Sequence, residues 1–310
     1  MKKSLFIIAS AFLLSIGISA GAATVKPLWL RDVQISPDGS TVAFCYKGDI
    51  WTVPATGGTA TRLTSLEGYD SNPVWSPDAS LIAFASRRKG GSDVYVMSSK
   101  GGDATRLTFN SASEIPTAFT PDGNSVIFNA AIQDPAESAL FPTSSMTELY
   151  SVPVNGGRVR QILGTPAEAV CFGNGGAFFL YQDQKGFEDE WRKHHTSSIT
   201  RDIWRYDTES GKHTNLTNRA GEDRNPVLSP DGKSIYLLSE VAAGSMNVWQ
   251  MPLAGTGHPE GKPAPSTEVP DGWKQITSFD THPVRFLSTG GGLLCFTWDG
   301  EIYTKREGSA

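Results

Sequence analysis

The sequence has 310 residues, a formal net charge of -5 and 19% charged residues. Its 27 Lys and Arg against 32 Asp and Glu leave no basic surplus to hold a phosphate backbone, so we expect no nucleic-acid partner. The charged fraction is too low for a disordered chain, and the length allows one large all-β unit with its own core.

Residues 1–22 have the pattern of a secretory signal peptide. Lys2 and Lys3 precede an apolar run that ends at Ile18, and Ala20-Gly21-Ala22 supplies small residues for cleavage. An uncleaved membrane anchor is the alternative, but the run is short for a bilayer span and no later segment is apolar enough. We therefore expect an exported, periplasmic protein without stable membrane insertion, whose mature part is residues 23–310.

A turn motif recurs along the mature sequence and begins each structural unit. Ser, Pro, Asp and Gly in that order suit a type I turn that closes a hairpin. The copies are Ser36-Pro37-Asp38-Gly39, Ser76-Pro77-Asp78-Ala79, Thr120-Pro121-Asp122-Gly123 and Ser229-Pro230-Asp231-Gly232, with weaker copies Gly173-Asn174-Gly175-Gly176 and Ser288-Thr289-Gly290-Gly291.

Each turn is followed by an apolar strand, and then by a third element that opens with an acid or Asn, an aliphatic and an aromatic residue. A structural, hydrogen-bonding role fits this opening residue, because it recurs with the repeat itself. The apolar strands begin at Thr41, Leu81, Ser125, Ala177, Ser234 and Leu293. The third elements begin Asp49-Ile50-Trp51, Asp93-Val94-Tyr95, Glu148-Leu149-Tyr150, Asp202-Ile203-Trp204, Asn247-Val248-Trp249 and Glu301-Ile302-Tyr303.

Five of these units continue into a fourth element, which follows a glycine turn in four of them. Its members contain Arg62-Leu63-Thr64, Arg106-Leu107-Thr108, Arg160-Gln161-Ile162, Asn215-Leu216-Thr217 and Gln275-Ile276-Thr277. Four-stranded units repeated at this period predict a β-propeller, here with six blades. Cys45, Cys171 and Cys295 are odd in number and lie in the apolar strands, so we interpret them as small buried hydrophobes.

The sixth blade has no room for a fourth strand after Glu301-Ile302-Tyr303. Either Val25–Leu30 supplies that strand and closes the ring, or the chain is cut from a longer protein just before it. We favour the second interpretation.

The repeat strings resemble the propellers of TolB and of the N-terminal six-bladed domain of tricorn-type serine peptidases. Two stretches favour the tricorn type: Ser144–Tyr150 in blade three, and Trp191 with Lys193 ahead of Arg201-Asp202-Ile203-Trp204 in blade four. The resemblance implies an accessory domain that filters or guides peptides toward a peptidase core, with PDZ-like and peptidase domains as downstream partners. It transfers no catalytic residue to this chain.

A search for catalytic motifs in the sequence is negative. It contains no G-x-S-x-G elbow, no H-E-x-x-H, no P-loop and no calcium-loop spacing. We therefore expect no catalytic residue, no cofactor and no metal site in this chain, although a nucleophile and a base from distant blades can still meet in space.

The long connections are the candidate functional features. Loops between second and third strands share one face of a propeller with the connections between blades, so insertions at 131–146 and 183–200 form a possible lid there. Asn72, Asn225 and His282 stand just before the predicted first strands of their blades, each followed by a proline, and are expected on that same face. A Gly- and Pro-rich insertion from Leu253 to Gly272 belongs to the opposite face.

The blade-four insertion holds the remaining candidate residues for binding peptides or a neighbouring domain. They are Glu188, Asp189, Trp191, Arg192, Lys193, His194 and His195, beside Glu190. Trp191 would pack on the ligand while the charges select its termini; the plainer alternative is a solvated loop anchored by one aromatic. Adjacent histidines rarely bind one metal ion without further ligands, so the pair is not interpreted as a metal site.

Three functions remain open at this point. The first is the peptide-binding accessory domain, the second a complete periplasmic TolB-like scaffold for protein partners, and the third a stand-alone hydrolase or lectin. Homo-oligomerisation is left open by the sequence.

Overall fold

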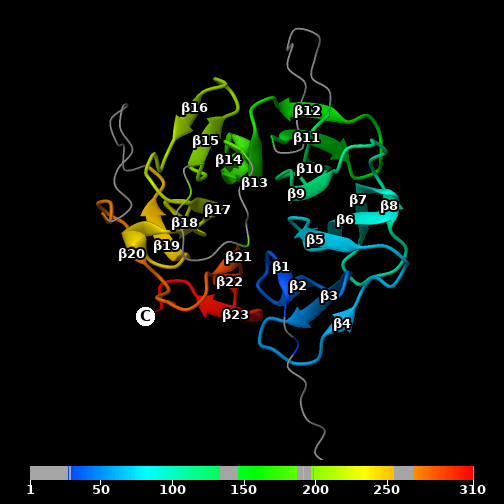
Figure 1. Cartoon of the computed structure of the whole chain (residues 1–310). Helices are drawn as coiled ribbons and strands as arrows, with labels where there is room; N and C mark the ends of the chain where they lie inside the picture. Colours follow the sequence, from blue (N-terminus) through cyan, green and yellow to red (C-terminus); the bar gives the residue numbers. More distant parts are fainter. Residues whose placement is uncertain are drawn as a thin grey trace, which may run out of the picture.

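The computed structural model describes residues 27, 29–132, 146–186, 191, 197, 199–254 and 268–309. The described chain forms six antiparallel sheets arranged around a central axis, as the repeats predict (Figure 1). Five sheets have four strands and the sixth has three, each in simple up-and-down order. This is a six-bladed β-propeller. Among the described residues no helix is long and apolar enough to cross a membrane.

The strands of each blade run from the axis outward in chain order. Blades one and two contain β1 Arg31–Ile35, β2 Thr41–Tyr46, β3 Asp49–Pro54, β4 Thr61–Arg62, β5 Asp70–Trp75, β6 Leu81–Lys89, β7 Gly91–Ser98 and β8 Thr105–Arg106. Blades three and four contain β9 Ile115–Phe119, β10 Ser125–Ala130, β11 Glu148–Pro153, β12 Arg160–Leu163, β13 Ala167–Phe172, β14 Phe178–Asp183, β15 Ile203–Asp207 and β16 His213–Asn215. Blades five and six contain β17 Asp223–Leu228, β18 Ser234–Ser239, β19 Asn247–Pro252, β20 Lys274–Gln275, β21 Arg285–Gly290, β22 Leu293–Trp298 and β23 Glu301–Arg306.

The repeated turn follows the chemistry expected from its sequence. The Ser36 hydroxyl accepts the Thr41 N–H at 3.0 Å, and Asp38 Oδ1 accepts the Ser40 N–H at 3.0 Å. Gly39, with φ of +74°, closes the turn by donating its N–H to Ser36 O at 2.8 Å. The Ser36 hydroxyl and the Ser40 N–H both donate to the Asp38 carboxylate, so the pKa of Asp38 lies below the usual range. Equivalent bonds form at Ser76, Thr120 and Ser229.

The two weaker copies of the turn differ from each other. Gly173 N donates to Phe178 O and Gly176 N to Gly173 O, which is the same arrangement as at Ser36. Blade six instead joins β21 to β22 by Gly291 and Gly292, both at positive φ, in a two-residue hairpin. The expected turn is therefore wrong for blade six, because Thr289 and Gly290 stand where the full copies have Pro and Asp.

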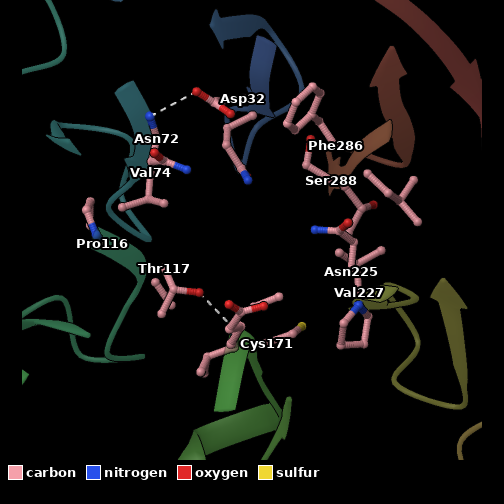
Figure 2. A pocket seen from close by; sticks show the side chains of 18 of the residues that line it. Asp32, Asn72, Val74, Pro116, Thr117, Cys171, Asn225, Val227, Phe286 and Ser288 are labelled. Carbon is pink, nitrogen blue, oxygen red and sulfur yellow. Dashed lines mark hydrogen bonds between the residues drawn. The ribbon is translucent and has the colours of Figure 1, made fainter. Parts of the chain in front are cut away.

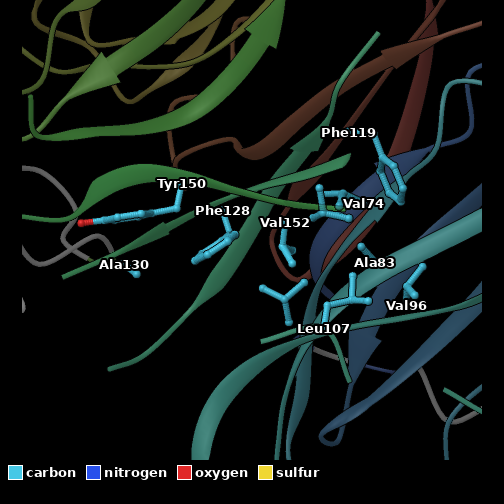
Figure 3. Packing of buried hydrophobic residues seen from close by; sticks show 11 residues of the cluster. Val74, Ala83, Val96, Leu107, Phe119, Phe128, Ala130, Tyr150 and Val152 are labelled. Atoms are coloured by element: carbon cyan, nitrogen blue, oxygen red, sulfur yellow. The ribbon is translucent and has the colours of Figure 1, made fainter. Parts of the chain in front are cut away.

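Hydrophobic residues pack between neighbouring blades rather than in one central core. Figure 3 shows the cluster between blades two and three, where Val74, Ala83 and Leu107 face Phe128 and Val152. Each fully buried valine or larger side chain of this kind stabilises the fold by about 1.5–3 kcal/mol. Such interfaces repeat around the ring and hold the blades at fixed angles.

The ring is closed by contact between the first and last blades. Each innermost strand contacts the innermost strands of both neighbouring blades, and β1 contacts β21. Ile35 N donates to Ser288 Oγ at 3.1 Å across this seam, and Gly291 N donates to Pro37 O at 2.9 Å. Trp29 and Leu30 are not in a strand, although Leu30 N donates to Gly300 O at 3.2 Å. Val25, Lys26 and Leu28 lie outside the described residues, so closure by that segment stays untested.

Candidate functional site: the central channel

The innermost strands of the blades enclose a channel of about 930 Å³ on the propeller axis. All six contribute to its wall, so the channel depends on the complete ring (Figure 2). The wall mixes prolines and aliphatic side chains with a few charges, among which Arg31, Asp32, Glu168, Arg224 and Arg285 lie in it.

A bulge interrupts the innermost strand of every blade. In five blades the bulge places a non-glycine residue at positive φ, a costly conformation that persists only where the surrounding fold enforces it. These residues are Asp32, Asn72, Ala169, Asn225 and Phe286, with φ between +49° and +58°. In blade three the corresponding bulge position is Pro116, and proline cannot take a positive φ. The bulges form a ring in the channel wall, which Figure 2 shows for Asp32, Asn72, Asn225 and Phe286.

Hydrogen bonds from neighbouring blades satisfy the backbone at these bulges. Asn72 N donates to Asp32 Oδ2 at 3.3 Å, and Asn225 N donates to Gln182 Oε1 at 2.9 Å. Thr117 Oγ1 accepts the Val170 N–H at 3.0 Å. The bulges therefore connect blades as well as shape the wall.

The three residues expected before the innermost strands lie in different places. Asn72 and Asn225 are inside β5 and β17, at the bulges, and line the channel. The expectation that they precede their strands is wrong, because the strands start two residues earlier. His282 does precede β21, and it is not among the described lining residues. Its ring contacts the Trp298 ring edge to face, and its Nε2 is 3.7 Å from Asp299 Oδ1.

Trp191 joins the blade-four connection to the opposite side of the channel. Its ring lies 6.0 Å from Phe286, and the guanidinium carbons of Arg31 and Arg285 lie 5.8 and 5.0 Å from its centroid. The side chain lines the channel and remains 39% exposed. Arg31 starts β1, so Trp191 lies at the end of the channel where the innermost strands begin. This is the face that the sequence predicts for the insertion.

The other candidates of this insertion lie outside the described residues. They are Glu188, Asp189, Arg192, Lys193, His194 and His195. Most of the blade-three insertion at 131–146 and of the blade-five insertion at 253–272 also lies outside them.

A buried ionic network flanks the channel and is absent from the sequence-based candidates. Arg201 Nη1 lies 3.0 Å from Glu222 Oε1, and its Nε lies 3.3 Å from Glu168 Oε2 in the channel wall. Burial alone would lower the pKa of Arg201, but the two carboxylates hold it above its usual value. Arg224 Nε lies 3.5 Å from the same Glu222 oxygen. No sequence signal pairs these residues, because Arg201 and Glu168 are far apart in the sequence of blade four, and Glu222 and Arg224 lie at the start of blade five.

The channel carries no recognisable catalytic geometry among the described residues, and no group of three His, Cys, Asp or Glu there is placed to hold a metal ion. The wall forms a passage with aromatic and guanidinium groups at one end.

A family model for the tricorn protease N-terminal β-propeller domain matches residues 27–309. The chain belongs to this family.

Solved structures agree with this fold. This chain matches the crystal structure of the tricorn protease with a TM-score of 0.71 and 23% identity, over 91% of this chain and 25% of that one. The chain thus spans about a quarter of the tricorn protease it matches. A putative TolB from Agrobacterium tumefaciens matches with a TM-score of 0.63, 16% identity and 91% coverage of both chains. TolB from Acinetobacter baumannii gives 0.56 and 19%, over 87% and 64%. No curated protein sequence matches.

Proposed function

We propose that this tricorn-type propeller is an exported, non-catalytic domain that binds peptides at the Trp191 end of its channel and serves a serine peptidase. The observation that carries the proposal is the position of Trp191, which reaches from blade four to blades one and six across the channel. The peptidase residues would belong to other domains or subunits.

The chemistry at this end of the channel suits an extended polypeptide. An exposed indole provides a large apolar surface, and Arg31 beside it provides donors for carbonyl or carboxylate oxygens. Peptide selection by shape and end charge needs only such features, without a catalytic group.

The direct test is a titration of the protein with a fluorescein-labelled, unstructured decapeptide that has free termini. Trp191→Ala should weaken binding about tenfold or more, because buried aromatic anchors dominate such interfaces. Thermal unfolding should change little, since the side chain is partly exposed and outside the interblade clusters.

Phe109→Ala is the matched control for this titration. Phe109 is also an exposed aromatic with an arginine over its ring, Arg106 at 4.6 Å, but it is not in the channel wall. Equal binding by wild type and Trp191→Ala, or equal losses in both variants, would contradict peptide capture at the channel.

A second candidate is a periplasmic TolB-like scaffold for protein partners. The observation in its favour is the 91% mutual coverage with the putative TolB, in contrast to a quarter of the tricorn chain. Capture of folded envelope proteins by the channel face, without affinity for unstructured peptides, would select this function.

A further inference from the structure

Three of the six blades carry a buried acid at the same backbone position, two residues before the bulge residue of the innermost strand. At this position the N–H donates to the carbonyl that precedes the opening acid of the third strand in the blade before. The donor–acceptor distances are 2.8 Å for Asp70, 2.7 Å for Glu114 and 3.0 Å for Asp223. All three side chains are at most 1% exposed, so an ionised carboxylate here needs a partner to offset the loss of its hydration.

In blades two and five a guanidinium group of the fold meets this acid. Arg88 Nη2 lies 3.0 Å from Asp70 Oδ2, and the guanidinium carbon lies 4.7 Å from the centroid of the Tyr95 ring. In blade five, Arg219 Nε lies 3.3 Å from Asp223 Oδ2. The position therefore combines a buried carboxylate with an arginine, and in blade two also with the aromatic residue of the third strand.

Blade three has no such arginine at either of the two places that supply one elsewhere. By the strand pairing of β9 with β10 and of β5 with β6, Ile132 stands where blade two has Arg88. Asn110 stands where the connection to blade five has Arg219, because each follows the threonine of the fourth element by two residues and precedes the acid by four. Within the described part of the chain, Glu114 Oε2 has no hydrogen-bond partner.

Arg106 is close to Glu114, but it is held by a different acid. Its Nη2 lies 2.8 Å from Oδ1 of Asp93, the acid that opens β7. The same pairing recurs in other blades, as Asp49 with Arg62 at 2.7 Å, Glu148 with Gln161 at 2.9 Å and Asp202 with Asn215 at 3.2 Å. The structural role expected for the acid that opens the third strand is confirmed by these pairs.

A pocket of about 540 Å³ lies at the place of the missing arginine. Its wall includes Glu114, Asn110, Ile132, Phe109 and Tyr150. Tyr150 stacks on Phe128 at 5.8 Å (Figure 3), as Tyr95 stacks on a phenylalanine of blade two at 5.9 Å. Phe109 is 72% exposed, so the pocket meets solvent beside it. Blade three thus has the acid and the aromatic ring of blade two with a space between them.

The insertion that follows Ile132 cannot supply the missing cation. Residues 133–145 contain no Lys, Arg or His. A cation that pairs with Glu114 therefore has to come from elsewhere than this neighbouring segment.

We propose that the pocket between blades two and three binds the alkylguanidinium group of a ligand, in the place that Arg88 fills in blade two. The guanidinium pairs with the Glu114 carboxylate and lies over the Tyr150 ring, and its alkyl chain packs on Ile132 and Val159. Guanidinium groups combine strong carboxylate hydrogen bonds with stacking on aromatic faces. Because Glu114 is 1% exposed, the wall has to open slightly for this contact. The proposal is independent of the channel and of peptide capture there.

The probe is butylguanidinium, titrated into the full chain by isothermal calorimetry at pH 8, above the pKa of about 7 of Glu114. Saturable binding of one molecule is expected. Butylurea has nearly the same shape without the charge, and it should bind about tenfold more weakly or worse. Absence of butylguanidinium binding, or equal affinity for butylurea, overturns the proposal.

Two protein variants locate the site. Glu114→Gln removes the carboxylate, and Asn110→Arg places a guanidinium in the pocket from within the chain, as Arg219 does in blade five. Each should weaken butylguanidinium binding about tenfold or more while thermal unfolding shows a folded protein. Leu66→Arg is the control, because it adds the same charge at the matching place of the blade-one connection, outside the pocket wall. Wild-type affinity in Glu114→Gln and Asn110→Arg, or an equal loss in Leu66→Arg, contradicts this pocket as the site.

A second probe distinguishes an arginine side chain of a polypeptide from a small free guanidine compound. The capped tripeptide acetyl-Gly-Arg-Gly-amide should bind more tightly than butylguanidinium if the pocket takes an arginine of a polypeptide, because the flanking backbone adds contacts. Weaker binding of the tripeptide identifies a free guanidine compound as the ligand. The channel titration stays separate from this site when its decapeptide contains no arginine.

Discussion

At the residue scale, Glu114 shows how burial raises the pKa of a carboxyl group. Its side chain is 1% exposed, and Oε2 has no hydrogen-bond partner among the described residues. Burial raises the pKa of Glu114 to about 7, against the lowering effect of a hydrogen bond with Thr108. The carboxyl lies beside a second pocket of about 540 Å³, whose wall includes Phe109 and Tyr150.

This raised pKa predicts a pH-dependent stability. In the unfolded chain Glu114 ionises near its ordinary pKa of 4.5, whereas in the folded chain it keeps its proton up to about 7. Unfolding therefore releases a proton in this window, and the free energy of unfolding should decrease as pH rises from 4.5 to 7. Glu114→Gln should remove the contribution of Glu114 to that slope and stabilise the protein at pH 8 by on the order of 1 kcal/mol, after discounting for screening.

Urea unfolding at pH 5, 6, 7 and 8 measures this effect. The two proteins should have similar midpoints at pH 5 and diverge above it. Glu114→Asp is a useful control, because it retains an ionisable group there and should keep a slope. Parallel curves for wild type and Glu114→Gln would show that the carboxyl ionises normally.

Some features of single residues could not be predicted from the sequence. Cys45 and Cys295 are buried as expected, but Cys171 is only half-buried because its strand, β13, lines the channel (Figure 2). Asn72 and Asn225 were recognisable from their place before a proline, yet nothing in the sequence shows their positive φ. Bulges depend on tertiary contacts between blades, which short-range patterns do not contain.

At the scale of elements, the repeat explains most strands and their pairing. Turn chemistry fixes where the first two strands meet, and the apolar pattern fixes the second and third. The fourth strands are two to four residues long, and three of them, β4, β8 and β20, are shorter than their three-residue sequence strings because only two residues pair with the third strand. The insertions between strands do not repeat from blade to blade, so the sequence predicts only the face on which each one lies.

The hairpin of blade six is the element that closes the ring, and Gly290 tests it. A Cβ built on Gly290 would lie 2.0 Å from the Ser36 carbonyl oxygen of blade one. Because the clashing atom belongs to the backbone, Gly290→Ala must move blades one and six apart and should destabilise the protein by about 2 kcal/mol. Thermal or urea unfolding measures the loss.

Gly244→Ala is the control for this substitution. Gly244 has a φ of -92°, and no heavy atom lies within 4 Å of a Cβ added there. It should change the free energy of unfolding by less than about 0.5 kcal/mol. Comparable stability of both variants would mean that the seam tolerates separation and that the ring is held elsewhere.

The whole molecule combines six similar blades into a site that no single blade contains. The sequence predicts the propeller and the face that holds the insertions, because both follow from the repeat. It does not predict that Trp191 of blade four meets Arg31 and Phe286, since that contact crosses the axis. The Arg201 network joins blade four to the start of blade five through Glu222.

The most direct test of the proposed function is an immunoprecipitation from the envelope of the source cells with an antibody against residues 31–309, read by mass spectrometry. A propeller that serves a peptidase should be recovered with serine peptidase sequences, in the same polypeptide or in a stable partner. Recovery with other envelope proteins and no peptidase would contradict this role and favour the TolB-like scaffold.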